Sequence, residues 1–182
     1  MTITVSSTTT EITALTTTDI AALTTTEIAA FQATHIAVLT TTQIGALTAT
    51  QVPSFSNTSI AAFSAAQIDG VTSTQLGALT TTQVGSLTTA QIGSIDATQV
   101  AGVTSAQIGV MSSTQFKALT AAGIGALTTT QMDGMTSTQL GALSTAQINS
   151  LTSGHIAGIN ATQIEGITTT QLAALTTTQV GG

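Results

Sequence analysis

An eight-residue repeat constrains this chain more than any other feature of its sequence. From Ser7 to Gly182 the sequence divides into 22 octads with no insertion or deletion. The unit at residues 39–46 reads Leu-Thr-Thr-Thr-Gln-Ile-Gly-Ala and is typical. A short unit repeated in unbroken register is typical of a solenoid, in which each unit buries its apolar side chains against its neighbours. We therefore predict a single solenoid over residues 7–182, preceded by a leader or cap at residues 1–6.

Two positions of the octad supply the predicted core. Position 1 is apolar in 21 of the 22 octads, with Ser7 as the exception, and position 6 is apolar in all 22. The large side chains follow the same rule, so we interpret them as core residues rather than as a binding platform. They are Phe31, Phe55, Phe63, Phe116, Met111, Met132 and Met135.

The polar positions predict a helical turn in each octad. Position 2 is Thr, Ser, Asp or Asn except at Gln32, and position 5 is Gln in 15 octads. This spacing matches a capping box, in which each of the two side chains bonds to the backbone N–H of the other residue. Leu39 and Ile44 have the spacing of the hydrophobic staple that accompanies it. We expect Gly or Ala at position 7 to close each turn, because Gly tolerates the left-handed conformation.

Alternate octads differ at positions 7 and 8. In one class, position 7 is always Gly or Ala after the terminal Thr13, and position 8 is mostly Ala. In the other class, position 8 is mostly Gly or Ser, and position 7 includes Pro53, Asp69, Lys117, Asp133, Asn149 and Glu165. We interpret this 16-residue period as one coil of two octads, which predicts about eleven coils and a rod with two unequal sides.

A two-sided β-solenoid with 16-residue coils is the alternative fold, because Thr, Ile and Val favour strands. Its difficulty is that positions 1 and 6 point to opposite faces of a straight strand, so every octad would need a bend. Pro53 favours this alternative, because it follows Val52 where a helix would barely pass its first turn. The capping-box pattern makes the solenoid of short, one-turn helices our prediction.

Composition excludes several kinds of partner. Lys117 is the only basic residue, and Tyr and Trp are absent, so the chain lacks charges to neutralise phosphates and rings to stack on bases. We therefore expect no nucleic-acid partner. No apolar stretch approaches 18 residues, so we predict no membrane insertion. The absence of Cys excludes disulfides, and residues 1–7 lack the features of a signal peptide.

No constellation of residues points to catalysis, and we expect no catalytic residue, cofactor or metal. His35 and His155 stand at position 5 and lie an odd number of octads apart, so we interpret each as a polar substitute for Gln. Glu11, Asp19 and Glu27 take position 5 in the first three octads. They are either a weak cation site or, as we favour, acids that complete the capping box at the positive end of a helical turn.

The charged and polar residues at position 7 have two interpretations. Asp69, Lys117, Asp133, Asn149 and Glu165 outline either a partner-binding stripe or a scattered set that keeps the rod soluble. Lys117 and Asp133 lie 16 residues apart and, in a coil of that length, would be neighbours. An exposed ion pair contributes at most about 1 kcal/mol, so we favour solubility.

The units at residues 39–46 and 79–86 resemble the Thr- and Gln-rich tandem repeats of large bacterial secreted or cell-surface proteins. That resemblance implies a structural role at or outside the cell surface. We therefore predict a rod-like spacer or stalk, or a filament segment that associates end to end. The alternative is an array of Thr side chains that binds ice or carbohydrate, and an enzyme is the least favoured class.

Overall fold

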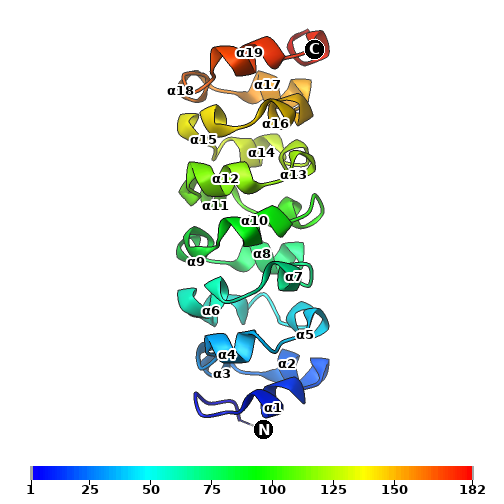
Figure 1. The fold of residues 1–182 in the computed structure, drawn as a ribbon, viewed down its shortest axis with the longest axis vertical. Coiled ribbons are helices and arrows are strands. Elements are labelled where there is room, and N and C mark those ends of the chain that lie inside the picture. Colours follow the sequence, from blue (N-terminus) through cyan, green and yellow to red (C-terminus); the bar gives the residue numbers. More distant parts are fainter. Residues whose placement is uncertain (1, 182) are drawn as a thin grey trace.

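The computed structural model describes residues 2–181 as a rod of short helices, with α1 and α20 at opposite ends (Figure 1). No β-strand occurs among these residues. The α-helices are α1 (Thr9–Thr13), α2 (Thr17–Ala22), α3 (Thr25–Ala29), α4 (Ala33–Ile36), α5 (Thr41–Gly45), α6 (Asn57–Ala61), α7 (Ala65–Ile68), α8 (Ser73–Ala78), α9 (Thr81–Ser86), α10 (Thr89–Ser94), α11 (Ser105–Val110), α12 (Ser113–Ala118), α13 (Ala121–Gly125), α14 (Thr129–Met132), α15 (Ser137–Ala142), α16 (Thr145–Ser150), α17 (Ser153–Gly158), α18 (Ala161–Ile164), α19 (Thr169–Ala174) and α20 (Thr177–Val180). Two 3-10 helices, η1 (Val52–Ser54) and η2 (Gln99–Gly102), take the place of an α-helix in their octads. The predicted solenoid of short helices is confirmed, and the β-solenoid is wrong for the described residues.

The capping box sets where each turn begins. In α9, the Thr80 hydroxyl accepts from the Gln83 N–H at 3.1 Å, and Gln83 Oε1 accepts from the Thr80 N–H at 2.8 Å. Every α-helix except α4, α6 and α13 begins with this reciprocal pair. The sequence pattern of positions 2 and 5 therefore predicted the local structure correctly.

The turns end differently from the prediction. Among the described residues no residue, glycine included, has a positive φ. Helix α9 ends instead at Leu87, which is extended with φ −62° and ψ 139°. The expected left-handed closure by Gly was wrong, because an extended residue at position 1 is enough to turn the chain. Pro53 lies within η1, so its octad keeps a helical turn.

The coil is longer than two octads. Helices that pack extensively against each other lie three octads apart, as α6 and α9 or α13 and α16 do. Position 5 side chains also reach backbone carbonyls 28 and 31 residues earlier, such as those of Phe63 and Ile60 from Gln91. A coil thus takes between three and four octads, and 22 octads make about six to seven coils. The predicted two-sided rod of eleven 16-residue coils was wrong.

The 16-residue alternation has a different cause. Because packed octads lie three apart, an octad of one class always packs on an octad of the other. Gly102, at position 8, lies so close to α8 that an added Cβ would collide with the Ser73 carbonyl oxygen. A Cβ on Gly77, at position 7 of α8, would lie 2.6 Å from the Gly102 carbonyl oxygen. By contrast, Gly85 in the second class has open space around it. The alternation therefore marks close backbone contacts between coils.

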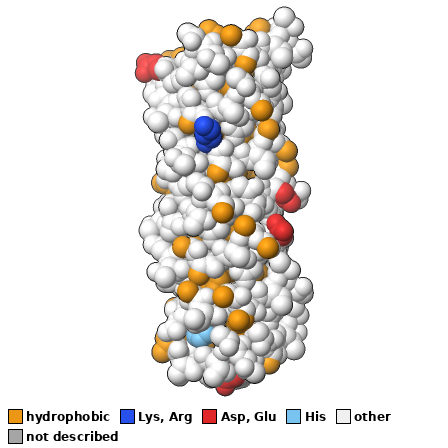
Figure 2. Space-filling model, viewed as in Figure 1, with side chains coloured by type: hydrophobic (Ala, Val, Ile, Leu, Met, Phe, Trp, Pro, Cys, Tyr) orange, Lys and Arg blue, Asp and Glu red, His pale blue; other side chains and the backbone are white. Residues whose placement is uncertain are grey.

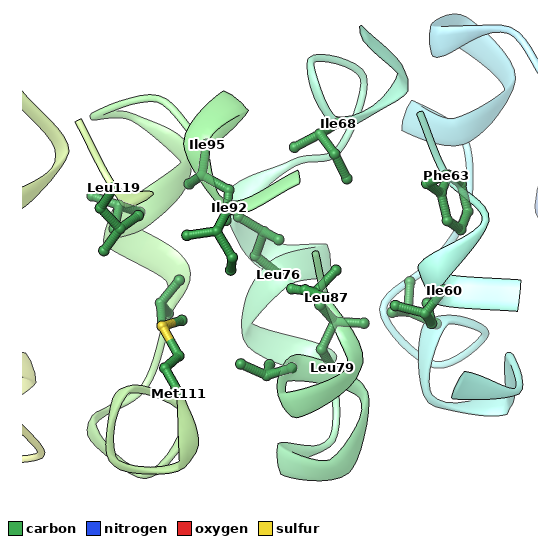
Figure 3. Close-up of a cluster of buried hydrophobic side chains, with 14 of the residues drawn as sticks. Ile60, Phe63, Ile68, Leu76, Leu79, Leu87, Ile92, Ile95, Met111 and Leu119 are labelled. Atoms are coloured by element: carbon green, nitrogen blue, oxygen red, sulfur yellow. The ribbon is translucent and has the colours of Figure 1, made fainter. Parts of the chain in front are cut away.

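Positions 1 and 6 form one continuous core along the rod. Figure 3 shows part of it, with side chains such as Ile60, Phe63 and Leu87 drawn from successive coils. Phe31, Phe55 and Phe63 meet edge to face, with ring centroids 5.8 to 5.9 Å apart. Phe116 is fully buried, and so in effect are Met111, Met132 and Met135. The assignment of the Phe and Met residues to the core is confirmed.

Candidate functional site

The most regular polar feature of the rod is a series of buried position 5 side chains, which we call the glutamine ladder. From octad 4 onward, each of these side chains except Gly123 bonds to the backbone carbonyl 28 residues earlier, over 2.6 to 2.9 Å. The ladder comprises His35, Gln43, Gln51, Ser59, Gln67, Gln75, Gln83, Gln91, Gln99, Gln107, Gln115, Gln131, Gln139, Gln147, His155, Gln163, Gln171 and Gln179. Each coil is therefore joined to the preceding one by several buried hydrogen bonds.

Gln91 shows how one amide serves both coils. Its Oε1 accepts from the Thr88 N–H at 2.7 Å and so caps α10. Its Nε2 donates to the carbonyls of Ile60 and Phe63, each at 2.8 Å. The residue is 1% exposed, and a buried amide needs partners on both its oxygen and its nitrogen. The capping box accounts for the oxygen alone, so the bond between coils is the function of Gln that sequence reasoning missed.

The two His residues belong to this ladder. His155 Nδ1 accepts from the Thr152 N–H at 3.2 Å, and Nε2 lies 2.7 Å from the Leu127 carbonyl oxygen. His35 makes the same pair of contacts, with Gln32 N–H and the Ser7 carbonyl. An imidazole with its proton on Nε2 reproduces the acceptor and the donor of Gln. The interpretation of both residues as substitutes for Gln fits these bonds, and the two residues are not brought together.

The first coil is the part of the rod where acids replace Gln. Glu11, Asp19 and Glu27 each accept from the backbone N–H and the hydroxyl of the Thr that caps their helix, as the preferred interpretation expected. No carbonyl 28 residues earlier exists for these side chains, so a carboxylate loses nothing by having no donor. The first position 5 residue that faces such a carbonyl is His35. The change from acid to donor therefore falls where the second coil begins.

The same bonds lower the acids' pKa values. The Thr8 and Thr24 backbone N–H groups are the main causes that hold the pKa of Glu11 and of Glu27 below the ordinary value, and the Thr16 hydroxyl is the main cause for the pKa of Asp19. Glu27 also accepts from the Ile3 N–H at 3.1 Å, where a ladder Gln would donate to a carbonyl.

The three acids line an open hollow of about 370 Å³ together with Ala14, Leu15, Ala22 and Leu23. Within residues 2–181, no group of three or more acidic, His or Cys side chains is placed to hold a metal ion. The arrangement therefore gives no support to the cation site considered from the sequence.

The charged residues at position 7 form no connected site. Asp69, Lys117, Asp133, Asn149 and Glu165 are all exposed. Figure 2 shows Lys117, the one blue side chain, apart from the acidic side chains visible on that face. The predicted neighbourhood of Lys117 and Asp133 depended on a 16-residue coil, and that coil length was wrong.

One octad interrupts the ladder. Gly123 has no side chain, so nothing reaches from α13 to the Ile95 carbonyl, which an added Cβ would approach to 3.9 Å. Ser59 keeps the inter-coil bond with a shorter side chain, because its hydroxyl donates to the Phe31 carbonyl at 2.6 Å. These two octads show that the register survives the loss of a single amide.

The fold and the ladder define a helical repeat solenoid held together by side-chain to backbone hydrogen bonds between coils. Residues 58–89 match the family model of the ALTTAQ repeat. In the matched stretch, residues 78–83 read Ala-Leu-Thr-Thr-Thr-Gln, which spans position 8 and positions 1 to 5 of the octad. Comparison with curated proteins and with solved structures gave no match. No helix among the described residues is long and apolar enough to cross a membrane.

Proposed function

We propose that this chain is a structural rod that acts as a spacer or stalk, at or outside the surface of a bacterial cell. The observation that carries the proposal is the glutamine ladder, which fixes each coil to the one before it along almost the whole array. Such a rod holds its two ends at a separation set by the number of octads. The extracellular setting comes from the resemblance to secreted and cell-surface repeats.

Two features support a spacer rather than a filament built from identical copies end to end. The first coil carries Glu11, Asp19 and Glu27 where a ladder donor would be needed. In addition, Ile3 packs into the core with 2% of its surface exposed and donates its N–H to Glu27. The amino-terminal end is thus covered and has no donor at position 5.

The spacer proposal is tested by measuring end-to-end distance. Because the chain has no Cys, Thr18→Cys and Thr170→Cys give two exposed sites for spin labels. We expect a narrow distance distribution in pulsed electron paramagnetic resonance. Deletion of residues 87–134, which removes six octads, should shorten the distance by about 15 to 20 Å, since stacked helices lie 8 to 10 Å apart. A broad distribution, or one that the deletion does not move, would contradict a rigid spacer.

A Thr-array binding module is the second candidate, because every position 4 residue is exposed and most are Thr. The position 2 hydroxyls are less available to a ligand, because they accept from backbone N–H groups, as Thr88 does from Gln91 at 3.2 Å. Thermal hysteresis at millimolar protein tests the ice-binding form of this candidate. The absence of activity there would remove it.

A further inference from the structure

The two ends of the rod differ in how well their apolar side chains are covered. Ile12, Ile20 and Ile28, at position 6 of the first coil, are fully buried. The equivalent residues at the other end are not, since Ile164 is 46%, Leu172 57% and Val180 62% exposed. Position 6 side chains are therefore covered by the coil that follows them. The last coil presents an apolar surface, which we call the carboxyl-terminal face.

The same face presents backbone acceptors. In the preceding coil, the carbonyls of Met135, Leu143 and Leu151 accept from Gln163, Gln171 and Gln179 at 2.8 Å. The next carbonyls in this series are those of Ile159, Ile167 and Leu175. Among residues 2–181, no donor reaches these three oxygens. The face thus combines apolar side chains with acceptors at the spacing of the ladder.

A second native copy joined head to tail does not complement this face. Its first coil would place Glu11, Asp19 and Glu27 opposite carbonyl oxygens, and a carboxylate is an acceptor only. Burial of a charge without a donor destabilises an interface strongly. Ile3 and its neighbours also lie over the coil that would have to dock.

We propose that the carboxyl-terminal face binds a coil of Thr-x-x-Gln octads from another polypeptide, one that carries Gln or His at position 5. Every interior coil of the rod shows the interface that would form, because the partner's amides would continue the glutamine ladder onto the carbonyls of Ile159, Ile167 and Leu175. The partner's position 1 and 6 side chains would cover Ile164, Leu172 and Val180. The inference concerns recognition between repeat arrays and stands apart from the spacer role.

A folded donor tests the proposal best, because a preorganised coil binds without the cost of ordering a peptide. The donor is this chain without residues 2–6 and with Glu11→Gln, Asp19→Gln and Glu27→Gln. Ile164→Asp and Leu172→Asp, at exposed positions, block its own carboxyl-terminal face. The acceptor is the native chain, of 18.0 kDa. Circular dichroism checks that the donor is folded.

We expect each protein to sediment as a monomer alone and the mixture to form a 1:1 complex of twice the mass. The matched control donor keeps Glu11, Asp19 and Glu27, and it should not bind. The native chain with Leu172→Asp should also lose binding. Equal binding of the acid-bearing donor, head-to-tail association of the native chain alone, or no complex with the folded Gln-bearing donor overturns the proposal.

A covalent extension provides a second test if the donor does not fold. A copy of residues 135–158 placed after Gly182 brings Gln139, Gln147 and His155 of the copy into register with the three free carbonyls. We expect a higher unfolding midpoint and less binding of an apolar dye than in the native chain. The same extension with Glu at those three copied positions should give neither effect. Equal results for the two extensions would show that ladder donors do not govern recognition.

Discussion

The Gln91 side chain donates to the carbonyl oxygen of Phe63, 28 residues earlier, at 2.8 Å. This bond joins two coils that are far apart in the sequence, whereas the other end of the same amide caps its own helix. Local structure and coil-to-coil packing therefore depend on one side chain. That dual use explains why a chain with so few charges and aromatic rings folds into an ordered rod.

Reversal of the ladder's polarity at this site should be costly. Gln91→Glu places a carboxylate against the carbonyls of Ile60 and Phe63 in a buried site, and we expect a loss of at least about 3 kcal/mol at pH 7. Urea denaturation followed by circular dichroism measures it. Glu11→Gln, at the same octad position in the first coil, is the control and should barely move the midpoint. Similar effects of the two substitutions would show that the inter-coil bonds contribute little.

The close contact at Gly102 gives a second prediction. Gly102→Ala forces apart the backbones of η2 and α8 at Ser73, and overpacking of this kind costs about 1 to 3 kcal/mol or more. Gly85→Ala lies within α9 in open space and should stabilise the protein by about 0.5 to 1 kcal/mol, since Ala favours helix. Thermal melts of both variants distinguish the two roles of Gly. A stable Gly102→Ala variant would contradict the backbone contact.

Completion of the ladder at its gap should stabilise the rod. Gly123→Gln supplies an acceptor for the Thr120 N–H and a donor for the Ile95 carbonyl, worth about 1 kcal/mol each. Gly123→Ala removes only the helix penalty of Gly, about 1 kcal/mol, and is the matched control. We expect the Gln variant to exceed the Ala variant in unfolding free energy. If the two variants are equal, the gap does not accommodate a ladder side chain.

The first coil predicts an acid-sensitive end. The pKa values of Glu11, Asp19 and Glu27 are lowered in the folded chain from ordinary values of 4.5 for Glu and 3.8 for Asp. A lowered folded pKa stabilises the fold fully above the ordinary value, and this stabilisation is lost as pH falls through the folded value. Amide exchange in α1 to α3 should therefore accelerate below about pH 4, whereas α9 to α11 change little.

The matched control for this prediction is the variant with Glu11→Gln, Asp19→Gln and Glu27→Gln. Its neutral amides cap the same helices but do not titrate, so its first coil should show no such acid sensitivity. An equal response in the native chain and in this variant would assign the effect to groups outside the first coil.

Local structure could be predicted from the sequence because the capping box lies within one octad. Thr80 and Gln83 fix the start of α9 without help from other coils. The coil length could not be read in the same way, since it depends on which distant carbonyl meets each Gln Nε2. The alternation at position 7 was assigned to a return after 16 residues, whereas it reflects contact between octads three apart, such as Gly77 and Gly102.

A signal for the correct coil length was nevertheless present in the candidate residues. Glu11, Asp19 and Glu27 are acceptors only, and His35 is the first position 5 residue able to donate. That change, after three octads, marks where the chain first passes over itself. The acids were interpreted through helix capping alone, which explains their bonds to Thr but not their restriction to the first three octads.

The pairing of unlike octads across coils also limits how such an array changes length in evolution. Loss or duplication of one octad would bring a residue with a side chain against the backbone of α8 or its equivalents, where Gly102 now fits. Changes of two octads preserve every pairing. Gene-level expansion and contraction should therefore proceed in steps of 16 codons, so the period that does not describe the coil describes the unit of inheritance.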